Sequence, residues 1–157
     1  MSQEYNWTMV PTTFLVAFVL TLLPMPGWAI WCRPAWLLMV LIYWVMMTPY
    51  RINLGAAWLI GIMLDVLNGT LLGEHALAMT VVAYLVAKMD SRFRMSSLVQ
   101  QSLSVFVLVL IYQFILFCIQ GFLGELPAHW LYWSPALSSM ILWPWIYGII
   151  RSGLIIR

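Results

Sequence analysis

Charged side chains are scarce in this sequence. Asp, Glu, Lys and Arg make up 8% of its 157 residues, about a third of the roughly 25% found in a soluble domain. So few charges cannot cover a water-facing surface, which excludes an ordinary soluble domain. Because 64% of the residues are hydrophobic and the mean hydropathy is +0.96, we expect a polytopic membrane protein. The net charge of +2 and the lack of any basic run exclude a nucleic-acid-binding surface.

Cysteine is also rare, and its placement excludes the usual cysteine chemistry. Cys32 and Cys118 do not form a CxxC pattern, which argues against a zinc or redox site. Neither has a base beside it in the sequence, so nucleophilic catalysis is not indicated. If both face the periplasm, a disulfide is an alternative to two free thiols.

Histidine occurs twice, at His75 and His129, without the HxxxH or HExxH spacing of a metal site. His75 directly follows Glu74 and comes after Asp65, so a metal site or a proton relay is one interpretation of these three residues. Polar side chains that cap a helix at the membrane interface are the favoured one. We therefore predict no metal and no cofactor.

Ionisable residues are missing from the middle of the apolar runs. The polar residues there are uncharged: Thr80, Gln113, Gln120 and Ser139. Proton pumps and ion transporters need a chain of ionisable groups inside the membrane, and no pair of broken helices indicates a transporter site. We predict that the chain is not an enzyme and has no catalytic residues.

Six apolar runs are present, separated by proline, glycine and polar residues. A helix needs ~20 apolar residues to cross a bilayer core of ~30 Å, and residues 34–47 are short for this unless the helix is tilted or covered by neighbours. We predict an all-α integral membrane protein, with residues 1–157 forming a single polytopic domain and a compact bundle of about six transmembrane helices. The predicted helices span roughly residues 8–23, 34–47, 52–67, 72–87, 98–122 and 134–150.

The Lys and Arg residues predict the orientation, because basic residues collect on the cytoplasmic side. A charged loop at residues 88–94 contains three of the seven basic residues and is therefore placed inside. Alternation of six spans then puts Arg51, Arg151, Arg157 and both termini inside. Arg33 alone falls on the outer side.

The stretch from Asp65 to Glu74 combines an acid with Gly69 and Gly73, which indicates a sharp turn or a close helix contact. Gly61, four residues after Ala57, forms a small-xxx-small pattern that permits close helix packing. A chance occurrence of small residues is the other interpretation.

Arg33 and Asp65 are expected at the outer ends of two adjacent antiparallel helices. We hypothesise that they pair, because each charge would offset the cost of the other at the membrane boundary. In the alternative, Arg33 extends to lipid phosphates and Asp65 faces water.

Four stretches together resemble the rod shape-determining protein MreD family. They are residues 33–38 (Arg-Pro-Ala-Trp-Leu-Leu) with Tyr43-Trp44, residues 49–55 (Pro-Tyr-Arg-Ile-Asn-Leu-Gly), the glycines and Asp65 between residues 61 and 73, and Leu142-Trp143-Pro144-Trp145. Pro144 is also expected to kink the last helix. The structural or interaction candidates are Arg33, Pro34, Gly61, Asp65, Gly69, Gly73, Trp143 and Pro144.

The resemblance implies a multi-pass protein of the bacterial inner (cytoplasmic) membrane that maintains rod cell shape. Its implied role is a non-catalytic scaffold of the elongasome, which carries out peptidoglycan synthesis along the cell. The implied partners are MreC by direct contact, and MreB, RodA and a class B penicillin-binding transpeptidase in the same complex. The family fold is similar to the substrate-binding subunits of vitamin transporters, so a small-molecule-binding membrane subunit is the alternative, although a shared fold does not transfer function.

Overall fold

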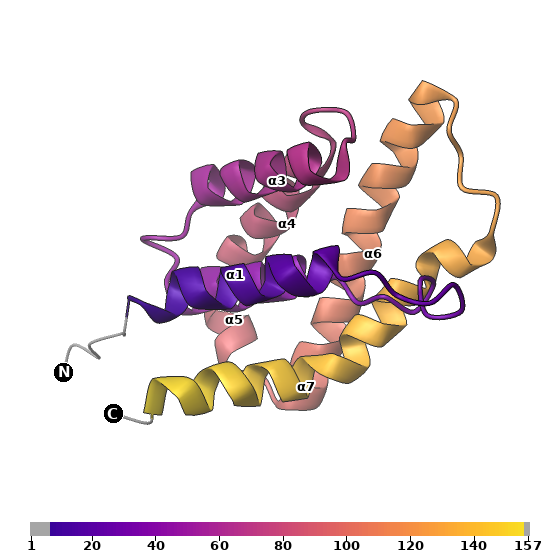
Figure 1. Cartoon of the computed structure of the whole chain (residues 1–157). Coiled ribbons are helices and arrows are strands. Elements are labelled where there is room, and N and C mark those ends of the chain that lie inside the picture. The colour runs from indigo at the N-terminus through magenta and orange to yellow at the C-terminus, as the bar shows by residue number, and fades with distance from the viewer. Residues whose placement is uncertain (1–6, 156–157) are drawn as a thin grey trace.

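The structure, a computed structural model, describes residues 7–155 and is all-α, as predicted. The described part holds seven α-helices and one 3₁₀ turn, arranged as in Figure 1. Their bounds are α1 Met9–Leu22, α2 Trp36–Met47, α3 Leu54–Asn68, α4 Glu74–Lys88, α5 Asp90–Met95, α6 Leu98–Leu123, η1 Trp130–Trp133 and α7 Ser134–Ile155.

Helix α2 is the centre of the bundle. Ten of its 12 residues are buried, and α1, α4 and α7 pack around it. A 12-residue helix is only about 18 Å long, shorter than the hydrocarbon core of a bilayer. Burial on all sides explains how a short segment is accommodated, because its flanks meet protein rather than lipid.

The charged loop expected at residues 88–94 is largely helical, which corrects that prediction. It forms the short helix α5, whose Phe93 is buried against Trp143 with ring centroids 6.3 Å apart. Arg94 donates a hydrogen bond of 3.0 Å to the carbonyl of Met46. A cation at the carboxyl end of α2 meets carbonyls that the helix leaves unpaired, so the basic segment is fastened to the central helix.

Two helix starts follow side-chain caps that the sequence analysis missed. The Asn53 carboxamide accepts from the amides of Gly55 and Ala56, so α3 begins at Leu54 rather than at residue 52. Ser97 accepts from Gln100 at the start of α6. At the start of α7, Ser134 donates its hydroxyl to the carbonyl of Trp31 and ties α7 to the connection before α2.

The start of α1 lies beside the end of α7. A Cβ built on Gly153 would lie 3.0 Å from the terminal methyl carbon of Met9, and both helix ends lie on one side of the molecule in Figure 1. Helix α7 continues through Pro144, and Figure 1 shows that it changes direction along its length.

Within the described residues, α6 is the one helix that is both long and apolar enough to cross a membrane. Helices α1, α2 and α3 are apolar but shorter. By length and composition, the expectation of about six transmembrane helices is therefore supported at α6 alone.

Candidate functional site

Helices α3 and α4 form an antiparallel pair with an exceptionally close contact. A Cβ placed on Gly61 would lie 2.3 Å from the Cα of Ala76 and 2.6 Å from its backbone nitrogen. Only glycine permits this approach, and Ala57, one turn earlier, is also fully buried. The predicted small-residue face is therefore confirmed as a helix contact, and the helix that occupies it belongs to the same chain.

Asp65 caps the amino end of α4 from the neighbouring helix. It has no exposed surface. Its Oδ2 accepts from the Gly73 amide at 2.9 Å and from the Ala76 amide at 3.5 Å, and its Oδ1 accepts from the His75 amide at 2.9 Å. These amides belong to the N-cap residue and the first turn of α4 and have no partner within the helix. The carboxylate supplies acceptors and also complements the positive end of the helix dipole.

Two side chains complete the shell around Asp65. His75 Nδ1 lies 2.7 Å from Oδ1, and the Thr70 hydroxyl donates to the same oxygen at 3.1 Å. This arrangement satisfies a charge that would otherwise be costly to bury. Asp65 is therefore a cap, as predicted, but it faces protein donors rather than water.

The turn between the helices depends on two glycines in the left-handed region. Gly69 has a φ of 67° and ends α3, and Gly73 has a φ of 103° and precedes α4. Other residues adopt these angles only with strain. The sharp turn predicted from this spacing is thus present, and it brings the amides of residues 73 and 75 back to Asp65.

Glu74 is buried, 4% exposed, and accepts from Gln120 Nε2 on α6 at 2.9 Å. Glu74 is expected at a helix terminus at the membrane interface. It is the first residue of α4, but it is buried against protein. Gln120 was noted only as an uncharged polar residue in an apolar run, and its distance along the chain gave no sign of this partner.

Arg33 does not pair with Asp65, which corrects the hypothesis drawn from their predicted positions. One terminal nitrogen of Arg33 donates to the carbonyls of Leu20 and Leu23, both at 3.3 Å. These groups are at the carboxyl end of α1, where unpaired carbonyls favour a cation. The acid and the cation thus serve different helix ends: Asp65 the start of α4, Arg33 the end of α1.

The remaining candidates lie apart from this corner. Pro34 is buried beside the start of α2, and Trp143 is fully buried with its indole nitrogen 3.4 Å from Gln101 Oε1. Pro144 is exposed. Cys32 and Cys118 are free thiols, and both are exposed.

The polar groups at the corner are not arranged for hydrolysis. In a catalytic triad, the acid and the nucleophile contact opposite nitrogens of the histidine ring. Here Asp65 and the Thr70 hydroxyl both face Nδ1 of His75, at 2.7 and 3.5 Å. Among the described residues, no group of three or more His, Cys, Asp or Glu side chains could hold a metal ion. The geometry fits a structural corner.

Fold and site together define an all-α, strongly apolar protein whose principal polar cluster connects helices. Comparison with known proteins gives the family. The model of the rod shape-determining protein MreD family matches residues 1–152. A curated relative, "Rod shape-determining protein MreD" of Haemophilus influenzae, is 36% identical over 146 residues, which cover 93% of this chain and 90% of the relative. No solved structure matches.

The chain therefore belongs to the MreD family of rod shape-determining proteins. This is a family of non-enzymatic membrane proteins that determine cell shape, and the resemblance identified from the sequence is confirmed.

Proposed function

We propose that this protein is a multi-pass scaffold of the bacterial inner membrane that binds MreC within the cell-wall elongation machinery. MreB, RodA and a class B penicillin-binding transpeptidase belong to the same complex. The observation that carries this proposal is the family match over nearly the whole chain. The corner at Asp65 supports it, because its carboxylate, backbone amides and hydroxyl form hydrogen bonds with one another that join α3 to α4. These polar groups therefore have a structural role.

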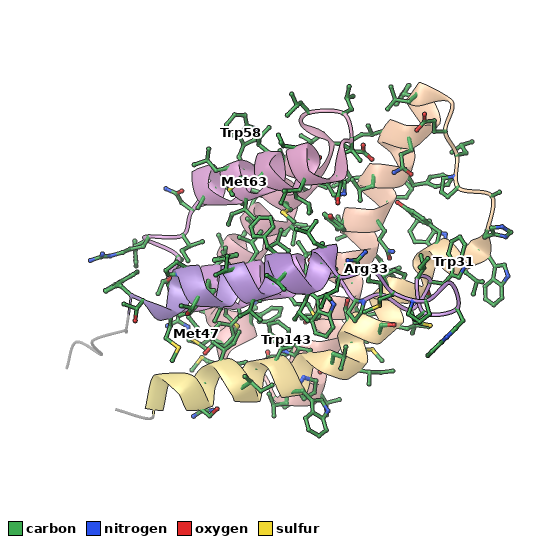
Figure 2. The ribbon with its side chains drawn as sticks, viewed as in Figure 1. Trp31, Arg33, Met47, Trp58, Met63 and Trp143 are labelled. Carbon is green, nitrogen blue, oxygen red and sulfur yellow. The ribbon has the colours of Figure 1, made fainter. Side chains whose placement is uncertain are left out.

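The basic residues support an orientation with both ends of the chain in the cytoplasm. Arg51 and Arg94 line one pocket at the carboxyl end of α2, and the Arg51 guanidinium lies 4.1 Å from the ring centroid of Trp7. Arg33 precedes the opposite end of α2, as the labels of Arg33 and Met47 in Figure 2 show. Basic residues favour the cytoplasmic side. Two of these three arginines lie at the carboxyl end of α2, so that end is assigned to the cytoplasm and the end with Arg33 to the outer side.

The outward face of α3 is the proposed MreC surface. Its exposed apolar side chains are Trp58, Leu59, Met63 and Val66, and Figure 2 shows Trp58 on the edge of the molecule away from α7, with Met63 on the same helix. The small face of the same helix, at Ala57 and Gly61, is occupied by α4 and is unavailable to a partner. Interactions between membrane helices rely on packing, which a broad aromatic and methionine face provides.

Cysteine crosslinking in membranes tests this surface. With Cys32 and Cys118 replaced by Ser, a single cysteine at Trp58 or Met63 should crosslink to MreC. A cysteine at Ile141, an exposed residue of α7, is the matched control and should not. Crosslinking from Ile141 alone would indicate that MreC contacts α7 instead. Crosslinking from none of the three positions would contradict a direct contact at these faces.

A further inference from the structure

Every buried side-chain polar atom without a partner in the described part of the chain belongs to a residue that lines one cavity. These atoms are Nε of Arg33, Nε1 of Trp36 and Oε1 of Gln113, and all three residues line a cavity of about 340 Å³ at the outer end of the bundle. Native proteins pair nearly all buried polar atoms. Three such atoms around a single cavity therefore require an explanation that the scaffold role does not supply.

The orientation of Gln113 is fixed by its other contacts. Its Nε2 donates to the main-chain carbonyl of Tyr132 at 2.7 Å, and the Tyr132 hydroxyl donates to the main-chain carbonyl of Gln113 at 3.3 Å. Burial raises the pKa of Tyr132 to about 12, so the phenol keeps its proton. Gln113 is 5% exposed, and its unpaired atom must be the carboxamide oxygen, which is an acceptor.

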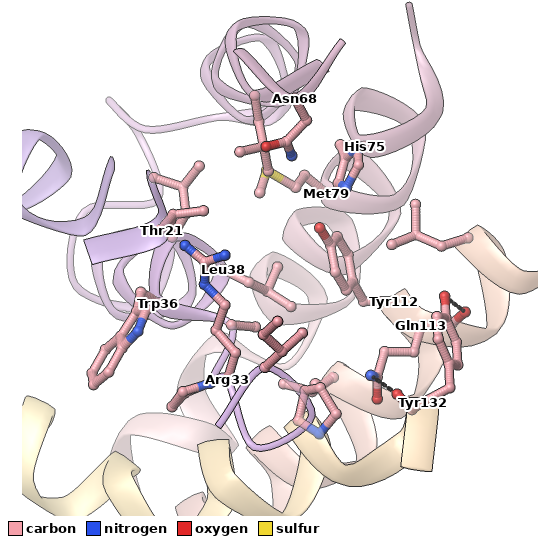
Figure 3. Close-up of a pocket in the computed structure, with 18 of the residues that line it drawn as sticks. Thr21, Arg33, Trp36, Leu38, Asn68, His75, Met79, Tyr112, Gln113 and Tyr132 are labelled. Carbon is pink, nitrogen blue, oxygen red and sulfur yellow. Dashed lines mark hydrogen bonds between the residues drawn. The ribbon is translucent and has the colours of Figure 1, made fainter. Parts of the chain in front are cut away.

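The cavity has two chemically different sides. Arg33 and Trp36 supply N–H donors on one side and Gln113 supplies an acceptor on the other, as Figure 3 shows. Arg33 is the one Lys or Arg among the lining residues, and no Asp or Glu lines the cavity. Asp65 is nearby but its oxygens are bonded to the turn that follows it. The positive side therefore has no internal counter-ion facing the cavity.

Between the polar sides the walls are apolar. Leu37, Leu38, Leu64, Met79, Val109 and Leu116 line the cavity. Apolar walls with a few convergent polar groups are typical of small-molecule sites, whose volumes begin at about 300 Å³.

We propose that this cavity binds the anionic end of a small amphiphile, with a phosphate or carboxylate oxygen at Arg33 and Trp36. A hydrogen-bond donor of the same molecule bonds to Gln113 Oε1, and its apolar part lies against the leucine-rich walls. Arg33 is suited to this role because guanidinium groups form strong charge-assisted hydrogen bonds with such oxygens. The anionic group belongs either to a membrane lipid or to a soluble molecule, and the two sources share the phosphate or carboxylate oxygen that Arg33 and Trp36 bind. The proposal is independent of MreC binding.

Native mass spectrometry of the full chain tests the proposal. The protein is purified into phosphatidylcholine nanodiscs with or without phosphatidylethanolamine and phosphatidylglycerol, and bound lipid is counted after release. In a second arm, inorganic phosphate and glycerol 3-phosphate are titrated calorimetrically into the detergent-solubilised protein. Lipid retained in the first arm identifies a membrane source, and saturable binding in the second identifies a soluble one.

The variants Arg33→Gln and Trp36→Phe each remove one donor. The loss of a hydrogen bond to a charged group predicts about tenfold weaker binding for Arg33→Gln, and a smaller loss for Trp36→Phe. The matched controls, Arg151→Gln and Trp145→Phe, change exposed residues outside the cavity and should bind as the wild type does.

Trp36→Phe keeps an aromatic ring, so it remains informative if Arg33→Gln does not fold. No binding in either arm would overturn the proposal and leave water as the partner of the three atoms. Equal binding by the wild type and both cavity variants would overturn it as well.

Discussion

Asp65 is a carboxylate with no exposed surface, and its oxygens accept from groups of Thr70, Gly73, His75 and Ala76. Such a group is stable only while its partners remain, because removing one side of a buried polar pair leaves the other side without a partner. Asp65 therefore acts as a cap between two helices.

Replacement of Asp65 by Ala should lower the free energy of unfolding by about 3–5 kcal/mol, the range for a broken buried pair. The reason is that backbone amides of residues 73 and 75 lose their acceptor. Thermal unfolding of the detergent-solubilised protein measures the loss. Glu125→Ala removes an exposed carboxylate from the connection between α6 and η1 and should change stability by no more than about 0.5 kcal/mol. Equal effects of the two substitutions would contradict the capping role.

At the level of single residues, the sequence predicted roles better than partners. A lone acid before two glycines was enough to predict a capped turn at residues 65–74. It could not show that His75 would contact Asp65, because the path of the turn decides which side chain returns. Gln120 lies 46 residues from Glu74, and only the packing of α6 on α4 brings them together.

Helix α3 packs against α4 at the distance that Gly61 permits. Gly61→Ala places a methyl group 2.3 Å from a backbone carbon of Ala76, so the helices must separate. Overpacking of this kind costs about 1–3 kcal/mol or more. We expect a lower melting temperature in detergent.

The matched control for Gly61 is Gly148→Ala. Gly148 lies within α7, and an added Cβ there meets nothing within 4 Å. Helix propensity predicts a gain of about 0.5–1 kcal/mol for this change. If Gly61→Ala is as well tolerated as Gly148→Ala, the close contact is not a constraint on the fold.

The connection between α3 and α4 gives a separate prediction. Gly73→Ala forces a φ near 103° on a residue with a side chain and should cost about 1–2 kcal/mol while creating no clash. MreC recovery after affinity purification should fall with it. Gly27→Ala, also in a connection without close contacts and without a positive φ, is the control. Unchanged stability and unchanged MreC recovery for Gly73→Ala would contradict the role of this turn.

At the level of the helices, the sequence predicted the all-α structure. The signal was a series of apolar runs bounded by proline and glycine. The one unexpected α-helix in the described residues, α5, has a charged sequence with no apolar run. Phe93 holds it in place through a contact with Trp143, 50 residues further along the chain, which local sequence cannot reveal. The sequence placed Arg33 correctly before α2. It could not predict that Arg33 would bond to the carbonyls of Leu20 and Leu23, because this depends on how the connection between α1 and α2 folds back.

The molecule as a whole presents two unlike ends, one with Arg51 and Arg94 and one with Arg33. This difference predicts the labelling of intact spheroplasts by a membrane-impermeant maleimide. In a Cys118→Ser background, exposed Cys32 should react from outside. A cysteine at Tyr50, which is 97% exposed, should react only after permeabilisation, in a background that also lacks Cys32. The reverse pattern would invert the orientation.

Co-purification with MreC from detergent-solubilised membranes measures the scaffold role most directly. The wild-type chain should retain MreC in a constant ratio across preparations, and Glu125→Ala should retain as much. Asp65→Ala, compared at equal amounts of membrane-inserted protein, should retain less, because the capped turn positions α3 and its outward face. Recovery of no more MreC by the wild type than by an unrelated inner-membrane protein of equal abundance would contradict a scaffold that binds MreC.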